Sequence, residues 1–214
     1  MAVTTLDISM SLDSFIAGPN QTVEEPLGEG GLQLHEWIFG LASWRERHGQ
    51  SGGVTNADSE VLQESVEATG AVVMGRRMFS GGEGPWENDP VAGGWWGEEP
   101  PFGVPVFVLT HHARQPVELQ GETAFTFVSE GVEAALEQAR AAAGDRNVAV
   151  AGGANVVQQF LAARLLDEIQ IHLVPVLLGG GVRLFGPGDE QPALELTRVI
   201  DSPTVTHLRY RVAN

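Results

Sequence analysis

The sequence predicts a three-layer α/β sandwich, in which a mostly parallel central sheet with an antiparallel edge carries helices on both faces. The chain has 214 residues, 43% of them hydrophobic, which suits a single domain with an ordinary core. Strand and helix patterns alternate through its middle, and this order favours parallel pairing. Near the end, Val205–Val212 alternates apolar and polar residues, as an antiparallel strand does. We therefore expect residues 1–214 to form one domain.

The N-terminal quarter predicts one strand, one short helix and two loops. Val3–Met10 is rich in Val, Thr and Ile and predicts a strand. Residues 18–33 contain several Gly and Pro residues and predict a loop, and Gln33–Gly40 then predicts a short amphipathic helix. Arg45–Asn56 is polar and Gly-rich, which predicts a second loop.

A helix and a buried strand are expected next. Asp58 is the expected N-cap of a helix whose inward face consists of Val61, Leu62, Ser65, Val66 and Thr69. Ala71–Met74 predicts a short buried strand. The following Gly81–Gly103 is a long loop that carries Trp86, Trp95 and Trp96. These tryptophans have three readings: they stack on a flat ligand, cover a dimer partner, or anchor the loop.

The second half of the chain repeats the strand and helix alternation. Three strands are expected at Val104–Leu109, Ala124–Val128 and Asn147–Ala151. Ser129 is the expected cap of a helix with the apolar face Val132, Ala135, Leu136, Ala139 and Ala143. The next helix is expected to bury Val156, Val157, Phe160, Leu161 and Leu165. Residues 169–173 alternate Ile and Leu with Gln170 and His172, which predicts a half-buried strand.

Charge and composition narrow the range of partners. The net charge of -16 repels phosphate backbones, so we do not expect a nucleic-acid partner, although a local basic cluster can still bind an anionic cofactor. The absence of Cys excludes disulfides and cysteine-ligated metals, and it fits a reducing cytoplasm. The N-terminal run lacks the pattern of a signal peptide, and no apolar stretch is long enough to span a membrane. We expect a cytoplasmic protein without a membrane partner.

Two strand-to-helix junctions carry the functional signal. In the first, the buried strand Ala71–Met74 is followed directly by Gly75, Arg76 and Arg77. A glycine there allows close backbone approach, the amides at a helix start point toward an anion, and arginines add charge-assisted donors. A plain turn with solvated arginines explains this spacing about equally well.

In the second junction, the strand Val148–Ala151 is followed by Gly152, Gly153, Ala154 and Asn155. The third glycine of a dinucleotide fingerprint is missing, and a tight turn is an alternative reading. Two such junctions in one sheet, however, place two helix N-termini at the carboxyl ends of parallel strands, where open α/β sheets bind ligands. Together they favour a nucleotide site.

These motifs resemble those of the dihydrofolate reductase family, and in particular the reductase domain of the riboflavin-biosynthesis deaminase/reductase. The resemblance extends over nearly the whole chain. It rests on the segments Met10–Gly18, Met74-Gly75-Arg76, Ala151-Gly152-Gly153, Leu165–Glu168 and Pro175–Gly179.

The resemblance implies an NADPH site, a homodimer and a cis bond between Gly152 and Gly153. Phosphate contacts would come from Gly75, Arg76 and Arg77, with one arginine on the 2′-phosphate. The adenosine side would be lined by Thr110 and His111, with help from Arg114. The pyrophosphate and the nicotinamide would contact the segment Ala151, Gly152, Gly153, Ala154 and Asn155.

The resemblance is specific for the cofactor and weak for the substrate. The riboflavin enzyme usually carries a deaminase domain, a Glu before the glycine pair and a Gly after the Asp of the first loop. This chain has no deaminase segment and carries Ala151 and Ser14 at those two positions. The expected activity is therefore an oxidoreductase similar to 5-amino-6-(5-phosphoribosylamino)uracil reductase or to dihydrofolate reductase, acting on a pterin-, pyrimidine- or flavin-related heterocycle. The alternative is an NADP(H)-binding protein without catalysis.

Reduction of a C=N bond needs a proton source, for which Asp13 and Glu36 are the catalytic candidates. Asp13 follows the first strand, and Glu36 lies on the first predicted helix. A surface role is an alternative for both. His172 is expected to be a satisfied structural histidine, and His35, His48 and His207 do not have metal-ligand spacing, so no metal site is expected.

Overall fold

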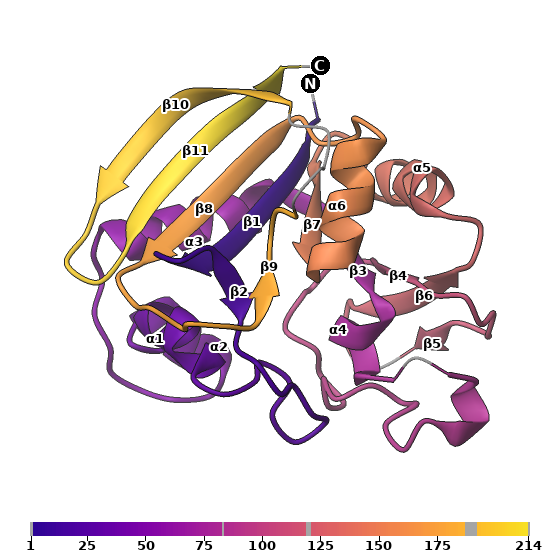
Figure 1. The fold of residues 1–214 in the computed structure, drawn as a ribbon. Helices are drawn as coiled ribbons and strands as arrows, with labels where there is room; N and C mark the ends of the chain where they lie inside the picture. Colours follow the sequence, from indigo (N-terminus) through magenta and orange to yellow (C-terminus); the bar gives the residue numbers. More distant parts are fainter. Residues whose placement is uncertain (1, 83, 119–120, 187–191, 214) are drawn as a thin grey trace.

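The structure is a computed structural model that describes residues 2–82, 84–118, 121–186 and 192–213. Its described strands form a nine-stranded sheet in the order β10-β11-β8-β1-β7-β3-β4-β6-β5 (Figure 1). The six strands from β8 to β6 are mutually parallel, whereas β10, β11 and β5 pair antiparallel at the two edges. The expected mostly parallel sheet with an antiparallel edge is confirmed.

The strands of the large sheet are β1 Thr4–Ser11, β3 Thr69–Gly75, β4 Val106–Leu109, β5 Val117–Glu118, β6 Ala124–Val128, β7 Asn147–Gly152, β8 Glu168–Val174, β10 Ala193–Asp201 and β11 Thr206–Ala213. A small antiparallel pair consists of β2 Phe15–Ala17 and β9 Val182–Arg183. The α-helices are α1 Glu36–Phe39, α2 Ala42–Arg47, α3 Ala57–Ala68, α4 Arg76–Ser80, α5 Val132–Ala143 and α6 Ala154–Ala162. Two 3-10 turns are η1 Gly31–His35 and η2 Trp86–Asn88.

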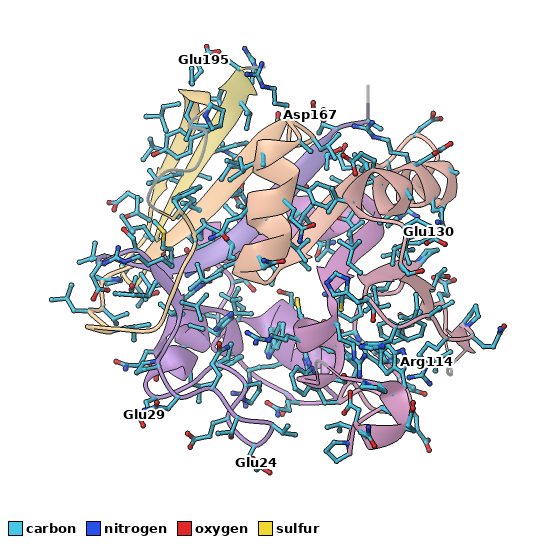
Figure 2. The ribbon with its side chains drawn as sticks, turned by 45° about the vertical axis from the view of Figure 1, so that its right-hand side comes forward. Glu24, Glu29, Arg114, Glu130, Asp167 and Glu195 are labelled. Carbon is cyan, nitrogen blue, oxygen red and sulfur yellow. The ribbon has the colours of Figure 1, made fainter. Side chains whose placement is uncertain are left out.

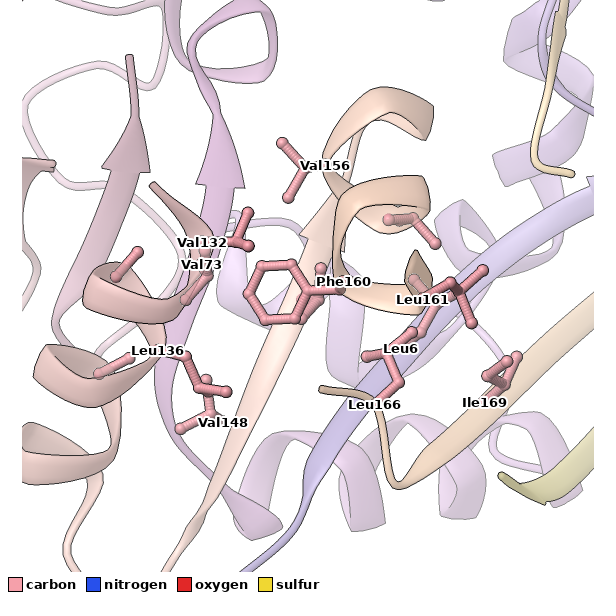
Figure 3. Close-up of a cluster of buried hydrophobic side chains, with 14 of the residues drawn as sticks. Leu6, Val73, Val132, Leu136, Val148, Val156, Phe160, Leu161, Leu166 and Ile169 are labelled. Carbon is pink, nitrogen blue, oxygen red and sulfur yellow. The ribbon is translucent and has the colours of Figure 1, made fainter. Parts of the chain in front are cut away.

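Helices cover both faces of the sheet, which makes the three layers. Side chains alternate along β3, so Ala71 and Val73 pack with α5 and α6, while Val72 and Met74 pack with Phe79 of α4 on the opposite face. Figure 3 shows the first of these clusters, in which Phe160 of α6 lies between Val73 and Leu6. The five apolar residues predicted for α5 are all buried, as its 3.6-residue period requires.

Two predicted helix caps are wrong. Helix α3 begins after Asn56, whose side chain accepts a hydrogen bond from the Ser59 amide, while Asp58 is buried and contacts His207. Helix α5 begins after Gly131, which has a φ of +99°, and Ser129 lies two residues further out. Asn and Asp are equally good caps, so a tertiary contact of Asp58 decided which residue took the role.

Other differences also come from long-range packing. The strand β8 is buried on both faces, including Gln170 and His172, because α1 and α3 cover its second face. Helix α2 takes up the beginning of the predicted loop Arg45–Asn56. The strands β2, β5 and β9 are too short to leave a pattern, and β10 is so exposed that its pairing with β11, rather than burial, makes it a strand.

The acidic surface predicted from the composition is visible in Figure 2, where the labelled, exposed carboxylates Glu24, Glu29, Glu130 and Glu195 lie around the periphery. Among the described residues, no helix is long and apolar enough to cross a membrane.

Candidate cofactor and active site

The predicted site residues follow strands that end at one edge of the sheet. Asp13 follows β1, Gly75 ends β3, Thr110 follows β4 and Gly152 ends β7. These strands belong to the parallel set, so their carboxyl ends point the same way and meet at the edge where open α/β sheets bind ligands. The topology thus brings the two glycine junctions side by side, with Met74 of β3 opposite Gly152 of β7.

Gly152 and Gly153 lie where β7 meets α6; Gly153 is exposed, whereas Gly152 is buried. The bond between them is cis, as the resemblance implied, and Gly152 has a φ of +112°, which side chains rarely adopt. A Cβ added at either residue would meet no described atom within 4 Å. At Gly75, in contrast, a Cβ would lie 2.9 Å from Val156 Cγ2, so Gly75 allows α6 to pack against β3.

This open backbone fits the pyrophosphate and nicotinamide of a dinucleotide. Helix α6 begins immediately after Gly153 without a side-chain cap, so its first-turn amides are available to an anion. Ala154 is buried, and Asn155 is exposed with its amide oxygen accepting from Gln159 Nε2 at 2.6 Å. Ala151 is half-buried and packs with the cluster on the α4 face.

Arg76 does not face solvent. Its Nη2 atom donates to Asp89 Oδ2 at 2.7 Å, and its Nε donates to Ser80 Oγ at 3.3 Å. Its guanidinium carbon lies 3.2 Å from the ring centroid of Trp86. The side chains of Arg76 and Asp89 are 8% and 2% exposed. Asp89 comes from the long loop Gly81–Gly103, and no local pattern in the sequence indicates that it pairs with Arg76.

Trp86 links the two arginines of the predicted adenosine side. Arg114 places its guanidinium carbon 4.4 Å from the Trp86 ring centroid and also donates to the carbonyl of Ala92. Trp86 itself donates from Nε1 to the carbonyl oxygen of His112 at 2.5 Å. Burial, together with the nearby positive charge of Arg76, lowers the pKa of Arg114. Trp86 therefore fits the third interpretation of the loop tryptophans, in which the side chain anchors the loop.

The remaining cofactor candidates lie around this group. Arg77 and His111 are exposed. Thr110 is buried, and its hydroxyl accepts from the amide of His112 at 3.1 Å, which closes the turn after β4. Arg76 and Arg114 share the Trp86 ring, and the charge of Arg76 is paired with that of Asp89.

Asp13 is fully engaged as a carboxylate. It accepts from Ser11 Oγ at 2.6 Å, from the Gly179 amide at 2.7 Å and from the Leu178 amide at 3.2 Å. The Ser11 hydrogen bond has the largest effect on the pKa of Asp13 and lowers it. Desolvation raises this pKa, but the amides of Gly179 and Leu178 lower it further, so it lies below its ordinary value. This geometry holds the turn after β8 against the end of β1, and it does not keep a proton on Asp13 at neutral pH.

Glu36 lies at the beginning of α1 and is exposed. Its neighbour Trp37 is buried and fixes the helix, because the indole Nε1 donates to Ser9 Oγ at 3.1 Å. The structure thus places Glu36 on a helix anchored to the middle of β1, and Asp13 at the end of the same strand.

A buried polar chain that the sequence analysis missed lies between the sheet and α3. Asp7 contacts His172 Nε2, His172 Nδ1 lies 2.6 Å from His207 Nδ1, and His207 Nε2 lies 3.0 Å from Asp58 Oδ1. Trp37 packs on both imidazoles, with ring centroids 4.7 and 5.2 Å away. The prediction that His172 is a satisfied structural histidine is confirmed.

The pairing of the two histidines requires that one Nδ1 donates and the other accepts. Burial lowers the pKa of His207, more than its bond to Asp58 raises it. Burial raises the pKa of Asp7, but the charge and hydrogen bond of His172, together with the hydrogen bonds from Ser65 and Gln170, lower it by more. No group of three or more His, Cys, Asp or Glu side chains in the described ranges is arranged to hold a metal ion.

A family model for the RibD C-terminal domain matches residues 2–208. The chain belongs to this family. Among curated proteins, YwjB of Bacillus subtilis is 38% identical over 60 residues, which are 28% of this chain and 34% of that protein, so the match spans about a third of the relative's length.

Solved structures with the same fold come from both branches of the resemblance. A putative riboflavin biosynthesis protein from Shewanella sp. PV-4 superposes with a TM-score of 0.62 at 21% identity, covering 99% of both chains. RibD of Acinetobacter baumannii gives 0.55 at 16% identity over 100% of this chain and 59% of that one. Dihydrofolate reductase of Enterococcus faecalis, solved with NADP(H), gives 0.54 at 13% identity over 99% and 97%. The dihydrofolate-reductase-like fold is therefore confirmed.

Proposed function

We propose that the protein is an NADPH-dependent reductase that transfers hydride to a C=N or C=C bond of a pterin-, pyrimidine- or flavin-related heterocycle. The observation that carries this proposal is the side-chain-free backbone of Gly152 and Gly153 at the start of α6, in a sheet edge that also presents Gly75. Membership of the RibD C-terminal domain family and the names of the similar structures, two of riboflavin biosynthesis and one a dihydrofolate reductase, support a reductase.

Different residues at this edge of the sheet bind different parts of the cofactor. The nicotinamide cofactor supplies the hydride. The backbone of Gly152, Gly153 and Ala154 holds the pyrophosphate through first-turn amides of α6, and the missing side chains let the cofactor lie directly on β7. Arg77, Arg114 and His111 bind the adenosine phosphate side. This arrangement fixes the reacting atoms in place and excludes water, which is the protein's share of hydride transfer.

Proton supply falls to Glu36 in this proposal. Asp13 acts instead as a positioning residue, because its three hydrogen bonds keep it ionised and tie the Leu178–Gly179 turn to β1. Glu36 is exposed on α1, and in this proposal it passes a proton from solvent to the ring nitrogen through water. Glu36→Gln should then lower kcat for a C=N substrate and leave the Kd of NADPH unchanged, because Glu36 does not contact the cofactor.

Two measurements test the function. NADPH fluorescence measures binding to the protein, and the loss of NADPH absorbance in the near ultraviolet measures turnover with dihydrofolate, pyrimidine and flavin substrates. Saturable NADPH binding with turnover of at least one heterocycle is the expected result. Failure to bind NADPH or NADH at all would contradict it.

One observation favours a second function, an NADP(H)-binding protein without catalysis. Asp13, one of the two carboxylates considered as proton sources, is held unprotonated by its hydrogen bonds. Under this alternative NADPH binds at the glycine edge, and no heterocycle of the panel is reduced.

A homodimer, from the family resemblance, and a cytoplasmic location, from the absence of Cys and of a signal-peptide pattern, complete the proposal. Size-exclusion chromatography with light scattering should give about twice the monomer mass of 22.8 kDa. A monomer at micromolar concentration would contradict the dimer.

A further inference from the structure

The carboxylate of Asp89 binds the guanidinium group of Arg76 in the way that a phosphate group would. Its Oδ2 atom accepts from Arg76 Nη2 and from Ser80 Oγ, both at 2.7 Å, and its Oδ1 accepts from the Val91 amide at 2.9 Å. The guanidinium group recognises carboxylate and phosphate oxygens with the same planar donors, so one group can replace the other on it.

The pair is buried but incompletely satisfied. Arg76 is 8% exposed, and its Nη1 atom has no hydrogen-bond partner among the described residues. A carboxylate that accepts through one oxygen binds Nη2 and leaves Nη1 without an acceptor. A phosphate offers three oxygens and can accept from both nitrogens. A buried donor without a partner is destabilising, and a better acceptor would recover that loss.

We propose that Asp89 is a specificity-determining residue of the cofactor site, where it competes with the 2′-phosphate of the cofactor for Arg76. This inference rests on the proposed function, in which Arg77 and Arg114 bind the adenosine phosphate side; Arg76 precedes Arg77 and shares the Trp86 ring with Arg114. By neutralising Arg76, Asp89 weakens the preference for NADPH over NADH. A 2′-phosphate that reaches Arg76 displaces Asp89, and NADH, which has a hydroxyl there, does not.

Displacement of Asp89 also moves its loop. Asp89 follows η2, and the same short helix carries Trp86, which stacks on Arg76 and donates to His112. Release of Asp89 therefore changes the surroundings of the Trp86 indole. Binding of a 2′-phosphate should consequently be visible in tryptophan fluorescence, whereas a ligand without this group should leave the Trp86 signal as it is.

The test uses two probes that differ by the phosphate in question, adenosine 2′,5′-bisphosphate and adenosine 5′-monophosphate. Asp89→Asn keeps the shape and removes the competing charge. It should tighten the bisphosphate about tenfold, as expected for a released charge-assisted contact, and leave the monophosphate within about twofold. Glu87→Gln is the matched control, because Glu87 is an exposed carboxylate of the same short helix, and its removal should change neither affinity. In the double variant Arg76→Ala/Asp89→Asn the gain should disappear.

The outcomes separate this inference from the proposed function. Equal bisphosphate affinity in wild type and Asp89→Asn, with NADPH still bound by both, overturns the role of Asp89 and leaves the reductase proposal intact. No binding of any nucleotide by the folded wild type overturns both. If Asp89→Asn does not fold, the wild-type protein still tests the role of Asp89. The bisphosphate must then change the tryptophan emission of the wild type more than the monophosphate does. The variant Trp86→Phe must remove that difference. An identical response to both probes overturns the inference.

Discussion

The two halves of the sheet bury charged groups in different ways. On the side of β3 and β4, Arg76 is paired with Asp89, which a long loop supplies. On the side of β8 and β11, His172 and His207 lie in register on neighbouring strands and are closed off by Asp58 of helix α3. Asp89 of the first pair belongs to a loop whose described residues do not pair with any strand of the sheet. The two histidines are held by two paired strands and a helix.

The difference shows which buried charges can exchange partners. Asp89 belongs to a loop, so the proposed exchange of Asp89 for a ligand moves one loop segment and leaves the strand pairing intact. The histidine pair opens only if α3 leaves the sheet, which amounts to partial unfolding. The proposal thus assigns ligand binding to the buried pair on one side of this protein, whereas the buried histidines on the other side hold α3 against the sheet. Four experiments test this difference.

The largest expected effect is on the histidine side. Asp58→Ala leaves the Nε2 of His207 buried without its acceptor, and leaving a buried donor unsatisfied costs about 1–3 kcal/mol, or more when the lost partner is charged. Urea denaturation measures the change, with Glu60→Ala as the control, because Glu60 is exposed on the same helix. A loss under about 1 kcal/mol would show that the histidine pair does not hold α3.

The second effect is expected at the glycine edge. Gly152→Ala places a side chain at a φ of +112° and should cost about 1–3 kcal/mol in unfolding free energy. The added methyl also projects into the open space assigned to the cofactor, so NADPH affinity should fall as well. Thermal melts and NADPH titrations measure the two losses. Unchanged NADPH affinity in a destabilised but folded variant would argue against the assigned cofactor position.

A smaller effect is expected for Arg77, which is exposed and so makes a screened contact. Arg77→Ala should weaken NADPH by about tenfold or less and weaken NADH less, because a 2′-phosphate contact is lost only with NADPH. Titrations of both cofactors at two salt concentrations measure this. An equal loss of affinity for both cofactors would indicate that Arg77 contacts the pyrophosphate, which both cofactors have.

The smallest effect is a pH dependence of stability. The pKa of His207 lies below its ordinary value of 6.5, so as the pH falls through this value the unfolded chain takes up a proton that the folded chain resists. The free energy of unfolding should therefore decrease between about pH 7 and pH 5. Asp58, His172 and Asp7 face His207 within the cluster and remain in the comparison variant His207→Gln, which should show a shallower decrease. The same slope in both proteins would assign the dependence to other groups.

Much of the fold could be predicted from local pattern. The buried faces of α5 and α6 and the strands β1, β3, β6 and β7 follow from hydrophobic period within one segment. The two glycine junctions were predictable for the same reason, because a buried strand followed by glycine is a local signal. The caps Asp58 and Ser129 were wrong because several residues near a helix start can serve equally well.

By itself, the sequence determined the layer order, the parallel core and the position of the glycine edge, because each depends on residues close together in the chain. Tertiary structure alone decided the partners of the charged residues. Arg76 meets Asp89 across a loop, and His172 meets His207 across a strand pair, at sequence separations of 13 and 35 residues. A charged side chain carries no periodic signal for its partner, since the strength of an ion pair depends on distance and burial, which exist only in the folded chain.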